Sequence, residues 1–265
     1  AMDERPIAVF DSGLGGISVL RALRRLMPEE RFHYFGDSAN APYGSRTTED
    51  IRALTLRHAE RLFADGAKAL VVACNTATSA AINELRAIYP QRIVIGIEPA
   101  LKPALACYPR GRIAVMATEA TLREKKFAAL MADCAGSCTI FKCPCPELVE
   151  FVERGELTGT ALENVLRREL AGVLSPAPDA VVLGCTHFPF LKCAINAVFG
   201  KEMHFFDGAE GTAKETRRRL ELAGLRTAQT AAGAVVLENS LNDPQWNALA
   251  ERLLYADQRF EFERS

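Results

Sequence analysis

Short apolar runs alternate with longer stretches of mixed polarity along most of the chain. The apolar runs are bounded by polar or turn-forming residues, which predicts β-strands at 7–11, 31–37, 69–74, 92–97, 112–118, 138–143, 180–185 and 203–207. The stretches between or after them carry apolar residues at helical spacing, which predicts helices at 17–27, 50–63, 76–88, about 120–132, 160–173 and 208–223. This alternation predicts an α/β protein with mainly parallel sheets flanked by helices.

Two of the predicted helices begin with a capping signal. Thr47 is followed three residues later by Asp50, and Thr160 by Glu163, which is the spacing of a capping box. The tail, 226–265, is expected to form a strand, a helix and a further strand that pack back onto a sheet.

The pattern of strands restarts near the middle of the chain. "IAV" opens the strand at residue 7 and again the strand at residue 113, and "VVACNT" is similar to "VVLGCT". A duplicated α/β half explains both matches. Ligands of open α/β sheets bind beyond the carboxyl ends of strands. The residues at such ends, which would share one cleft if the two halves face each other, are Asp11, Asp37, Cys74, Thr118, Cys185 and Asp207.

The composition is that of an ordinary soluble protein. Of the 265 residues, 49% are apolar and 25% charged, and the net charge is −1, so neither nucleic acid nor a membrane surface is an expected partner. No apolar run approaches the roughly 20 residues that span a bilayer. No signal peptide is visible, so we expect a cytoplasmic protein whose eight cysteines are reduced thiols.

Two cysteines end apolar strands at matching places in the two halves. In "VVACNT" Cys74 precedes Asn-Thr, and in "VVLGCTH" Cys185 precedes Thr-His. For either cysteine alone, apolar packing is a common alternative. A strand-to-helix turn offers free backbone N–H groups, which lower the pKa of a thiol from its usual value of about 8.5 and make it a base or nucleophile. The matching positions favour chemistry over packing.

Two turns are candidates for ligand binding. "DSGLGGISVL" at 11–20 imitates a dinucleotide fingerprint, but Ser18 replaces its third glycine. A tight turn that aims N–H groups at a carboxylate uses these glycines equally well, and an unliganded turn stays open. "GDSANAPYG" at 36–44 is either a surface loop or a substrate loop in which the N–H groups of Tyr43 and Gly44 bind an anion.

Other chemical candidates are weaker. The cysteines between residues 134 and 145 have the spacing C-x3-C-x4-C-x-C, which is not a usual zinc pattern, so no metal site is predicted. In extended backbone His187 shares a face with Cys185 and can assist it. Asp11 can instead cap a helix, and Glu150 can lie on a solvated helix face. The three remaining histidines show no partner pattern and are interpreted as structural.

The stretches "FDSGLGG", "PYG", "VVACNTAT" and "VVLGCTHFP", in this order, resemble the cofactor-independent glutamate racemases of bacterial cell-wall synthesis. The resemblance extends from about residue 7 to residue 223. It implies two similar α/β domains with the active site in the cleft between them. The first domain contains residues 1–98 plus 207–265, and the second contains residues 99–206.

The resemblance also implies roles for individual residues. Cys74 and Cys185 become the acid/base pair, Asp11 and His187 assist their respective thiols, and Glu150 is a carboxylate near the second thiol. The residues expected to contact substrate are Ser12, Tyr43, Gly44, Asn75, Thr76, Thr118 and Thr186. In the family, Cys185 works on the L face of the substrate and Cys74 on the D face. No cofactor and no metal are implied, and a homodimer stays open.

The resemblance makes the expected reaction the interconversion of L- and D-glutamate, supplying D-glutamate for peptidoglycan. Without an imine electron sink, donors such as Asn75 and the threonines around the substrate carboxylate must stabilise the carbanion. Three alternatives remain from the sequence. They are an aspartate or other amino-acid racemase of the same superfamily, a dinucleotide-dependent oxidoreductase built on the 11–20 turn, and a non-catalytic two-lobed amino-acid-binding protein.

Overall fold

The computed structural model describes residues 3–98, 100–134 and 136–256. The chain divides into two compact units. Unit 1 contains the residues up to Glu98 together with Ala209–Leu254, and unit 2 contains the residues between them, up to Gly208. The division predicted from the sequence differs from this one at residues 207–208 and near the C-terminus, where 257–265 lie outside the described residues.

Unit 1 is built on a five-stranded sheet with the order β4-β3-β1-β2-β9. Its strands are β1 (Ile7–Asp11), β2 (Phe32–Gly36), β3 (Ala69–Val72), β4 (Ile93–Gly96) and β9 (Val235–Asn239). Its helices are α1 (Ile17–Leu26), α2 (Thr48–Ala64), α3 (Asn75–Ile88), α10 (Ala209–Ala223) and α11 (Pro244–Tyr255), with short 3₁₀ turns η1 (Ser38–Asn40) and η2 (Tyr43–Ser45). Each of its described strand pairings is parallel.

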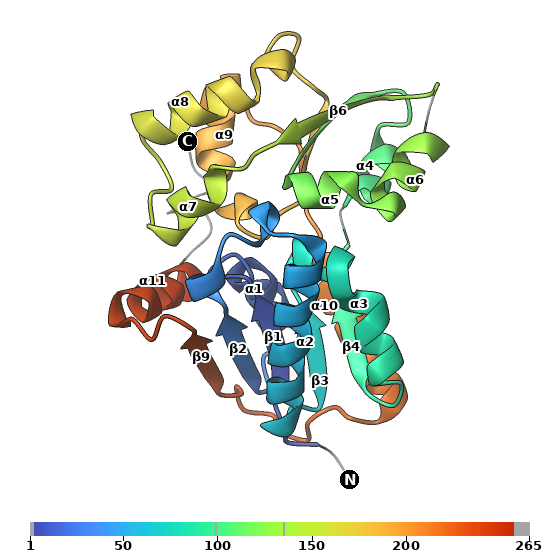
Figure 1. Ribbon diagram of the computed structural model, residues 1–265, viewed down its shortest axis with the longest axis vertical. Helices are drawn as coiled ribbons and strands as arrows, with labels where there is room; N and C mark the ends of the chain where they lie inside the picture. Colours follow the sequence, from blue (N-terminus) through green and yellow to red (C-terminus); the bar gives the residue numbers. More distant parts are fainter. Residues whose placement is uncertain (1–2, 99, 135, 257–265) are drawn as a thin grey trace. The chain divides into compact units, whose positions relative to one another are not determined.

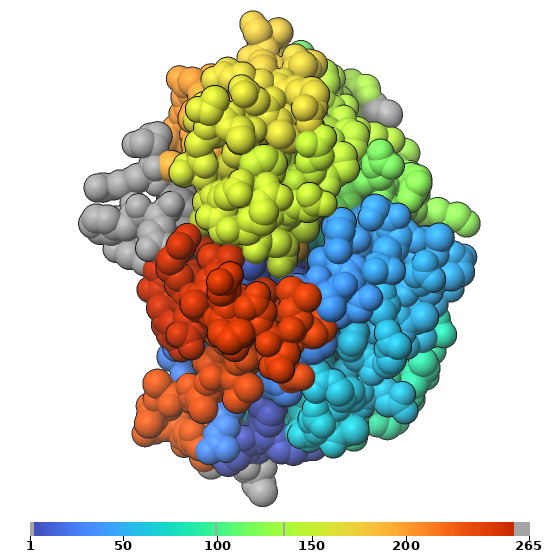
Figure 2. All heavy atoms as spheres, turned by 60° about the vertical axis from the view of Figure 1, so that its left-hand side comes forward, coloured from blue at the N-terminus to red at the C-terminus, as the bar shows by residue number. Residues whose placement is uncertain are grey.

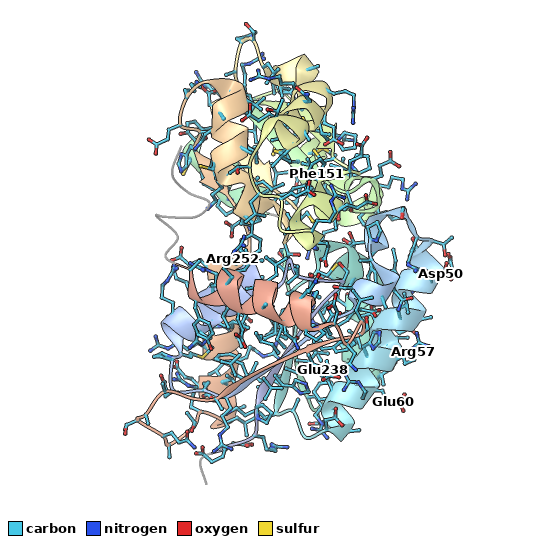
Figure 3. All side chains as sticks on the ribbon, turned by 90° about the vertical axis from the view of Figure 1, so that its left-hand side faces the viewer. Asp50, Arg57, Glu60, Phe151, Glu238 and Arg252 are labelled. Carbon is cyan, nitrogen blue, oxygen red and sulfur yellow. The ribbon has the colours of Figure 1, made fainter. Side chains whose placement is uncertain are left out.

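The central strands of unit 1 are buried on both faces, which explains their continuous apolar sequence. α2 and α3 cover one face, where Phe10 and Val72 pack among apolar residues of both helices. α1 and α10 cover the other face (Figure 1). The edge strand β9 comes from the C-terminal part of the chain and pairs with β2 (Figure 3, where Glu238 is labelled on β9).

Unit 2 has a four-stranded sheet with the order β6-β5-β7-β8, and its described strand pairings are parallel too. Its strands are β5 (Arg112–Ala117), β6 (Thr139–Pro144), β7 (Ala180–Leu183) and β8 (Phe205–Phe206). Its helices are α4 (Leu101–Cys107), α5 (Glu119–Arg123), α6 (Lys125–Asp133), α7 (Leu148–Glu153), α8 (Thr160–Glu169) and α9 (Lys192–Phe199), with 3₁₀ turns η3 (Ala171–Val173) and η4 (Phe188–Leu191). α4, α5 and α6 cover one face, and α7, α8 and α9 lie on the other (Figure 1).

The two-sheet α/β fold predicted from the pattern is confirmed, and the differences are local. The helix predicted at about 120–132 is broken into α5 and α6 at Glu124, whose backbone is extended. The capping box at Thr160 is wrong, because Gly159 is the N-cap of α8 and Thr160 is its first helical residue. Thr47 does cap α2 by accepting a hydrogen bond from the Asp50 N–H at 3.1 Å.

The internal repeat is visible in the strand register of the two sheets. Ile7 of β1 lies opposite Ala69 of β3, and the matching Ile113 of β5 lies opposite Ala180 of β7. The chain runs straight on from β3 to Cys74 and from β7 to Cys185. The two cysteines therefore occupy equivalent places, each beyond the carboxyl end of a strand next to the first strand of its unit.

Among the described residues, no helix is both long and apolar enough to cross a bilayer.

Candidate active site

The first half-site lies beyond the carboxyl ends of β1, β2 and β3, all in unit 1. Asp11 ends β1, Asp37 follows β2 and Cys74 follows β3, and all three are buried. The N–H of Asp37 donates to the carbonyl of Asp11 at 3.0 Å, so the two acidic residues sit side by side. Parallel strands end at the same edge of a sheet, and this register brings these three side chains together.

Cys74 is the N-cap residue of α3. The Ala77 N–H donates to its Sγ at 3.3 Å, and the Ser12 Oγ lies 3.7 Å from the same sulfur. A helix N-terminus carries partial positive charge and free N–H groups, which favour an anion at this place. The Cys74 sulfur therefore accepts a backbone hydrogen bond at the positive end of α3.

The turn after β1 binds the side chain of Asp11. The Gly13 N–H donates to the Asp11 carboxylate at 3.0 Å. A Cβ on Gly16 would lie 2.6 Å from the Asp11 Cβ, so only glycine fits where the chain passes this side chain. The glycines thus shape a tight turn around the chain's own Asp11 carboxylate.

Asp37 organises the loop that follows β2. Its carboxylate accepts hydrogen bonds from the Tyr43 hydroxyl at 2.6 Å and from the Asn40 amide at 3.0 Å, and the His58 Nε2 lies 2.9 Å away. Burial opposes ionisation of Asp37, but the contacts with His58, Tyr43 and Asn40 outweigh it and lower its pKa to about 2. Burial, together with Asp37, raises the pKa of Tyr43 far above its usual value, so this hydroxyl stays a donor.

The sequence reasoning missed this network. His58 was interpreted as structural without a partner, because Asp37 lies on another element. The η2 turn of this loop packs against α3, the helix that Cys74 caps, so the loop lies beside the first thiol. Gly44 sits in η2 next to Tyr43. The loop predicted to bind an anion is therefore part of the first half-site.

Asn75 offers an acceptor with no partner. It is the first residue of α3 and is only 5% exposed. Its Oδ1 is buried and has no hydrogen-bond partner in the described part of the chain. An unsatisfied buried amide oxygen costs free energy of about 1–3 kcal/mol. A ligand that donates an N–H to this oxygen would remove that cost. Thr76, the next residue, is also buried.

The second half-site lies beyond the carboxyl end of β7 in unit 2. The Cys185 Sγ lies 3.7 Å from the His187 Nδ1, and the His187 Nε2 lies 2.6 Å from the Glu153 Oε1. His187 is completely buried, whereas the Glu153 side chain is 17% exposed. Thiol, imidazole and carboxylate thus form a chain in which each member contacts the next.

The charge of His187 follows from these two neighbours. Burial disfavours its charged form, but the contacts with Cys185 and Glu153 outweigh burial and raise the pKa of His187 well above its usual value. The imidazolium faces the Cys185 sulfur on one side, and the Glu153 carboxylate on the other side fixes the orientation of the ring.

The structure corrects the carboxylate predicted for this half-site. Glu150 is on α7, but its side chain is 63% exposed and its nearest ionic partner is Arg154, at 3.8 Å. The carboxylate against His187 is Glu153, three residues further along the same helix. Positions i and i+3 lie on neighbouring parts of a helix surface. The packing of α7 against η4 decides which of the two faces the histidine.

The predicted threonines of unit 2 flank the same edge of its sheet. Thr118 follows β5 and caps α5, where its Oγ1 accepts from the Thr121 N–H at 3.3 Å. Thr186 is between Cys185 and His187 and is 4% exposed. Asp207, also at a strand end, lies 3.9 Å from Lys192 and not in this group of contacts.

No group of three or more His, Cys, Asp or Glu side chains suited to a metal ion is found among the described residues. The cysteines between 134 and 145 are free thiols, two of them buried. What the two half-sites offer chemically is proton transfer at sulfur. One thiol lies at a helix N-terminus near two carboxylates, and the other lies beside a charged histidine.

Two all-parallel α/β units, each with a cysteine beyond the matching strand, define a class of proteins equipped for acid–base chemistry with thiols. The profile of the Asp/Glu/Hydantoin racemase family matches residues 16–216. A glutamate racemase of Clostridium perfringens (strain ATCC 13124) is 45% identical over 249 residues, covering 94% of this chain and 96% of the relative. The chain belongs to the Asp/Glu/Hydantoin racemase family and is a racemase.

Solved structures agree with this assignment. The glutamate racemase of Escherichia coli, in complex with L-glutamate and the activator UDP-MurNAc-ala, aligns with a TM-score of 0.81 at 31% identity and covers 98% of this chain and 97% of its own. The glutamate racemase of Francisella tularensis, in complex with D-glutamate, aligns with a TM-score of 0.82 at 25% identity and covers 97% and 96%.

Proposed function

We propose that the protein interconverts L-glutamate and D-glutamate and that Cys74 and Cys185 act as the two acid–base groups. The observation that carries the proposal is the pair of thiols at equivalent strand ends, each with its own proton-handling partners. Further support comes from relatives: one structure in the family binds L-glutamate and another binds D-glutamate. The proposal requires that one substrate molecule meet both thiols.

Racemisation requires one group on each face of the α-carbon. In the direction from D to L, the Cys74 thiolate removes the α-proton and the Cys185 thiol delivers a proton to the opposite face. In the reverse direction Cys185 is the base and Cys74 the acid. One sulfur must be charged and the other neutral at the start of each turnover, so the pair titrates as a coupled unit.

The partners of each thiol handle the proton that it gains or loses. Next to Cys74, the Asp11 carboxylate and the N-terminus of α3 are the local charges. Next to Cys185, the His187 ring contacts the sulfur, and Glu153 keeps the ring oriented. Glu153 replaces Glu150 as the carboxylate proposed to assist the second thiol, because it is the one in contact with His187.

The substrate ammonium and carboxylate have candidate partners in the same regions. The unpartnered Oδ1 of Asn75 suits the ammonium group, which can donate to it. N–H groups of the loop at Tyr43 and Gly44 suit a carboxylate. Ser12, Thr76, Thr118 and Thr186 are further proposed contacts, all within four residues of a strand end. Fixed donors around the substrate carboxylate would stabilise the carbanion as its charge develops.

The decisive experiment follows the optical activity of glutamate. Purified protein is incubated with D- or L-glutamate without added cofactor, and circular dichroism at the amino-acid band is recorded until equilibrium. We expect either enantiomer to lose its signal. A panel containing aspartate and alanine tests the nearest alternative. Faster turnover of aspartate than of glutamate would contradict the proposed substrate.

The proposed cellular role is the supply of D-glutamate for peptidoglycan from the cytoplasm, with no cofactor bound. It is tested by complementation of a bacterial strain that requires D-glutamate for growth. A homodimer stays a prediction, and sedimentation of the purified protein measures it. Failure to restore growth by a protein that racemises glutamate in vitro would contradict the role and leave the chemistry intact.

A further inference from the structure

We propose that Trp246 and Asn239, in the C-terminal segment, are positioning residues that hold the substrate loop 37–46 through the hydroxyl of Ser38. The inference rests on the proposed function, in which this loop binds the substrate carboxylate. It assigns a role to a segment that contributes no residue to the acid–base pair.

The Ser38 hydroxyl is the point where the C-terminal segment meets the loop. The Asn239 Nδ2 donates to the Ser38 Oγ at 2.8 Å, and the Trp246 Nε1 donates to the same oxygen at 3.0 Å. The amide orientation of Asn239 is fixed, because its Oδ1 accepts the Leu241 N–H at 2.8 Å. Two donors therefore use the two acceptor positions of one hydroxyl.

Both donors are buried. Trp246 is 4% exposed and Asn239 is 8% exposed, so neither N–H group has ready access to water when Ser38 moves away. A buried donor without a partner is unfavourable. The cost favours the loop conformation in which Ser38 accepts both bonds. A third contact acts in the same direction, since the Ala39 N–H donates to the Ser240 Oγ at 2.9 Å.

Trp246 is also linked, through Tyr34, to the turn that follows Asp11. Its ring stacks against Tyr34 with 6.3 Å between centroids, and the Tyr34 hydroxyl donates to the carbonyl of Gly13. A Cβ on Gly36 would lie 3.1 Å from the indole ring and 2.5 Å from the Gly13 oxygen. The indole is therefore linked to both loops of the first half-site, one through its N–H and the other through its ring.

The helix that carries Trp246 is held at its other end as well. Arg21 of α1 donates through its Nη1 to the carbonyl of Leu253, near the end of α11. Figure 3 shows α11, on which Arg252 is labelled, above β9. In Figure 2 the red atoms of the C-terminal segment adjoin blue atoms of the N-terminal part of the chain. The helix α11 is therefore bonded to the rest of unit 1 near both of its ends. A shift of Trp246 would move its N–H away from Ser38 and loosen the loop.

Ser38 is directly next to Asp37, the residue that organises the loop of the first half-site. Ser38 opens η1, and Asp37 beside it accepts the hydroxyl of Tyr43 and the amide of Asn40. Loss of the bonds to Ser38 leaves the loop held from the Asp37 side only. We expect weaker binding of glutamate in both directions of the reaction, with little effect on proton transfer.

The test uses three variants of the full chain. Trp246→Phe keeps an aromatic ring against Tyr34 and removes the N–H. Ser38→Ala removes the acceptor. Leu254→Ala, buried on the same helix about two turns from Trp246, is the control for general loss of stability. The first two should raise KM for D- and L-glutamate about 3- to 10-fold and change kcat less than about 2-fold, while the control should leave KM unchanged.

The double variant Ser38→Ala/Trp246→Phe tests whether the two single substitutions raise KM through the same hydrogen bond or through separate effects. It should raise KM no more than Ser38→Ala alone, since both remove the same bond. Additive effects on KM, or an unchanged KM in both single variants, would overturn the proposal. A rise in KM in Leu254→Ala equal to that in Trp246→Phe would also overturn it, because loss of stability then explains the result.

Two readouts do not depend on racemisation. Trp246 is the only tryptophan, so its fluorescence reports on the junction formed by Ser38, Asn239 and Trp246. Ser38→Ala should shift its emission. Amide hydrogen exchange of residues 37–46 should be faster in Trp246→Phe than in the wild type without any substrate. Unchanged emission and exchange would reject the junction even if glutamate is racemised. Faster exchange in a protein that does not racemise glutamate would reject the proposed function and keep the junction.

Discussion

The two half-sites stand on equivalent strands of two related sheets, yet they surround their cysteines with different charges. In unit 1 the buried carboxylates of Asp11 and Asp37 lie at the ends of β1, the neighbour of β3, and of β2, the next strand beyond it. In unit 2 the matching backbone bond runs from the Cys145 N–H to the carbonyl of Ala117, so neutral residues take these two places. The acidic residue of unit 2 comes instead from α7 and reaches the cysteine through His187.

The helix that follows each cysteine differs as well. Cys74 caps the 14-residue α3, and a backbone N–H contacts its sulfur. Cys185 is followed by η4, a single 3₁₀ turn, and its sulfur contacts the imidazole of His187. The two units thus share a backbone arrangement that places a thiol at the same strand end. The residues in contact with each thiol differ. The difference suits two thiols that must be in opposite protonation states.

The largest effects are expected when one of the two cysteine sulfurs is removed at a time. Cys74→Ser and Cys185→Ser should each lower kcat/KM by roughly 10³-fold or more, because a hydroxyl is too weak an acid to act as its anion near neutral pH. Turnover is measured by chiral chromatography. In deuterated water, early product should carry α-deuterium while unreacted substrate stays protonated. Near-normal racemisation by either variant would remove that cysteine from the mechanism.

A large effect is also expected at the carboxylate that the structure selects in unit 2. Glu153→Gln should lower kcat about 10- to 100-fold, since the His187 ring loses the partner that orients and charges it. Glu150→Gln, on the same helix, is the matched control and should stay within about 2-fold. Initial rates in both directions check this. Equal losses in the two variants would mean that Glu153 has no special relation to the second thiol.

The comparison also predicts which sulfur reacts first with an alkylating reagent. The two cysteines are similarly buried, at 5% and 8% exposure, so access does not separate them. The Cys185 sulfur contacts the His187 imidazole, whereas the Cys74 sulfur contacts a backbone N–H and the Ser12 hydroxyl. A neighbouring imidazole assists attack by sulfur, so at pH 7 we expect iodoacetamide to label Cys185 roughly 10-fold faster than Cys74. Peptide mass spectrometry after short reaction times gives the ratio. His187→Gln should abolish the preference, and faster labelling of Cys74 would reverse the assignment.

The smallest expected effect concerns stability against pH and has opposite signs in the two half-sites. The lowered pKa of Asp37 stabilises the fold above pH 3.8, and this contribution is lost as pH falls through about 2. Its shift corresponds to about 2 kcal/mol at neutral pH. The raised pKa of His187 stabilises the fold below the unfolded value near 6.5, and this is lost as pH rises through the higher folded value.

Urea unfolding at several pH values tests these signs. The destabilisation caused by Asp37→Asn should shrink toward pH 2, and that caused by His187→Gln should be largest at low pH and shrink as pH rises. A pH-independent loss in either variant would show that packing, not ionisation, accounts for its effect.

Many of the strands, helices and strand-end residues were predictable from the sequence, because they depend on residues only a few positions apart. A buried parallel strand is a short apolar run, and the residues that follow it are polar, so the run itself points to Cys74 and Cys185. The N-cap of α2 at Thr47 was predictable for the same reason. The helix break at Glu124 and the failed cap at Thr160 were not, since helical spacing continues through both positions and the backbone departs from it only in the folded chain.

The contacts between elements could not be predicted in this way. Nothing near His58 in the sequence points to Asp37, and nothing near Trp246 points to Ser38, because each pair joins residues from different elements. The choice between Glu150 and Glu153 is of the same kind. Both lie on α7 three residues apart, and the helical pattern describes them equally well.

The sequence by itself determined two α/β halves, their strands, and a cysteine at the matching strand end of each. These features follow from apolar periodicity and turn residues, which act over a few positions. Only the tertiary structure decided which carboxylate reaches His187, that Asp37 holds Tyr43, and that the C-terminal helix is bonded to Ser38. Those outcomes depend on the packing of side chains that are distant in the chain, and burial then fixes the charge that each of them carries.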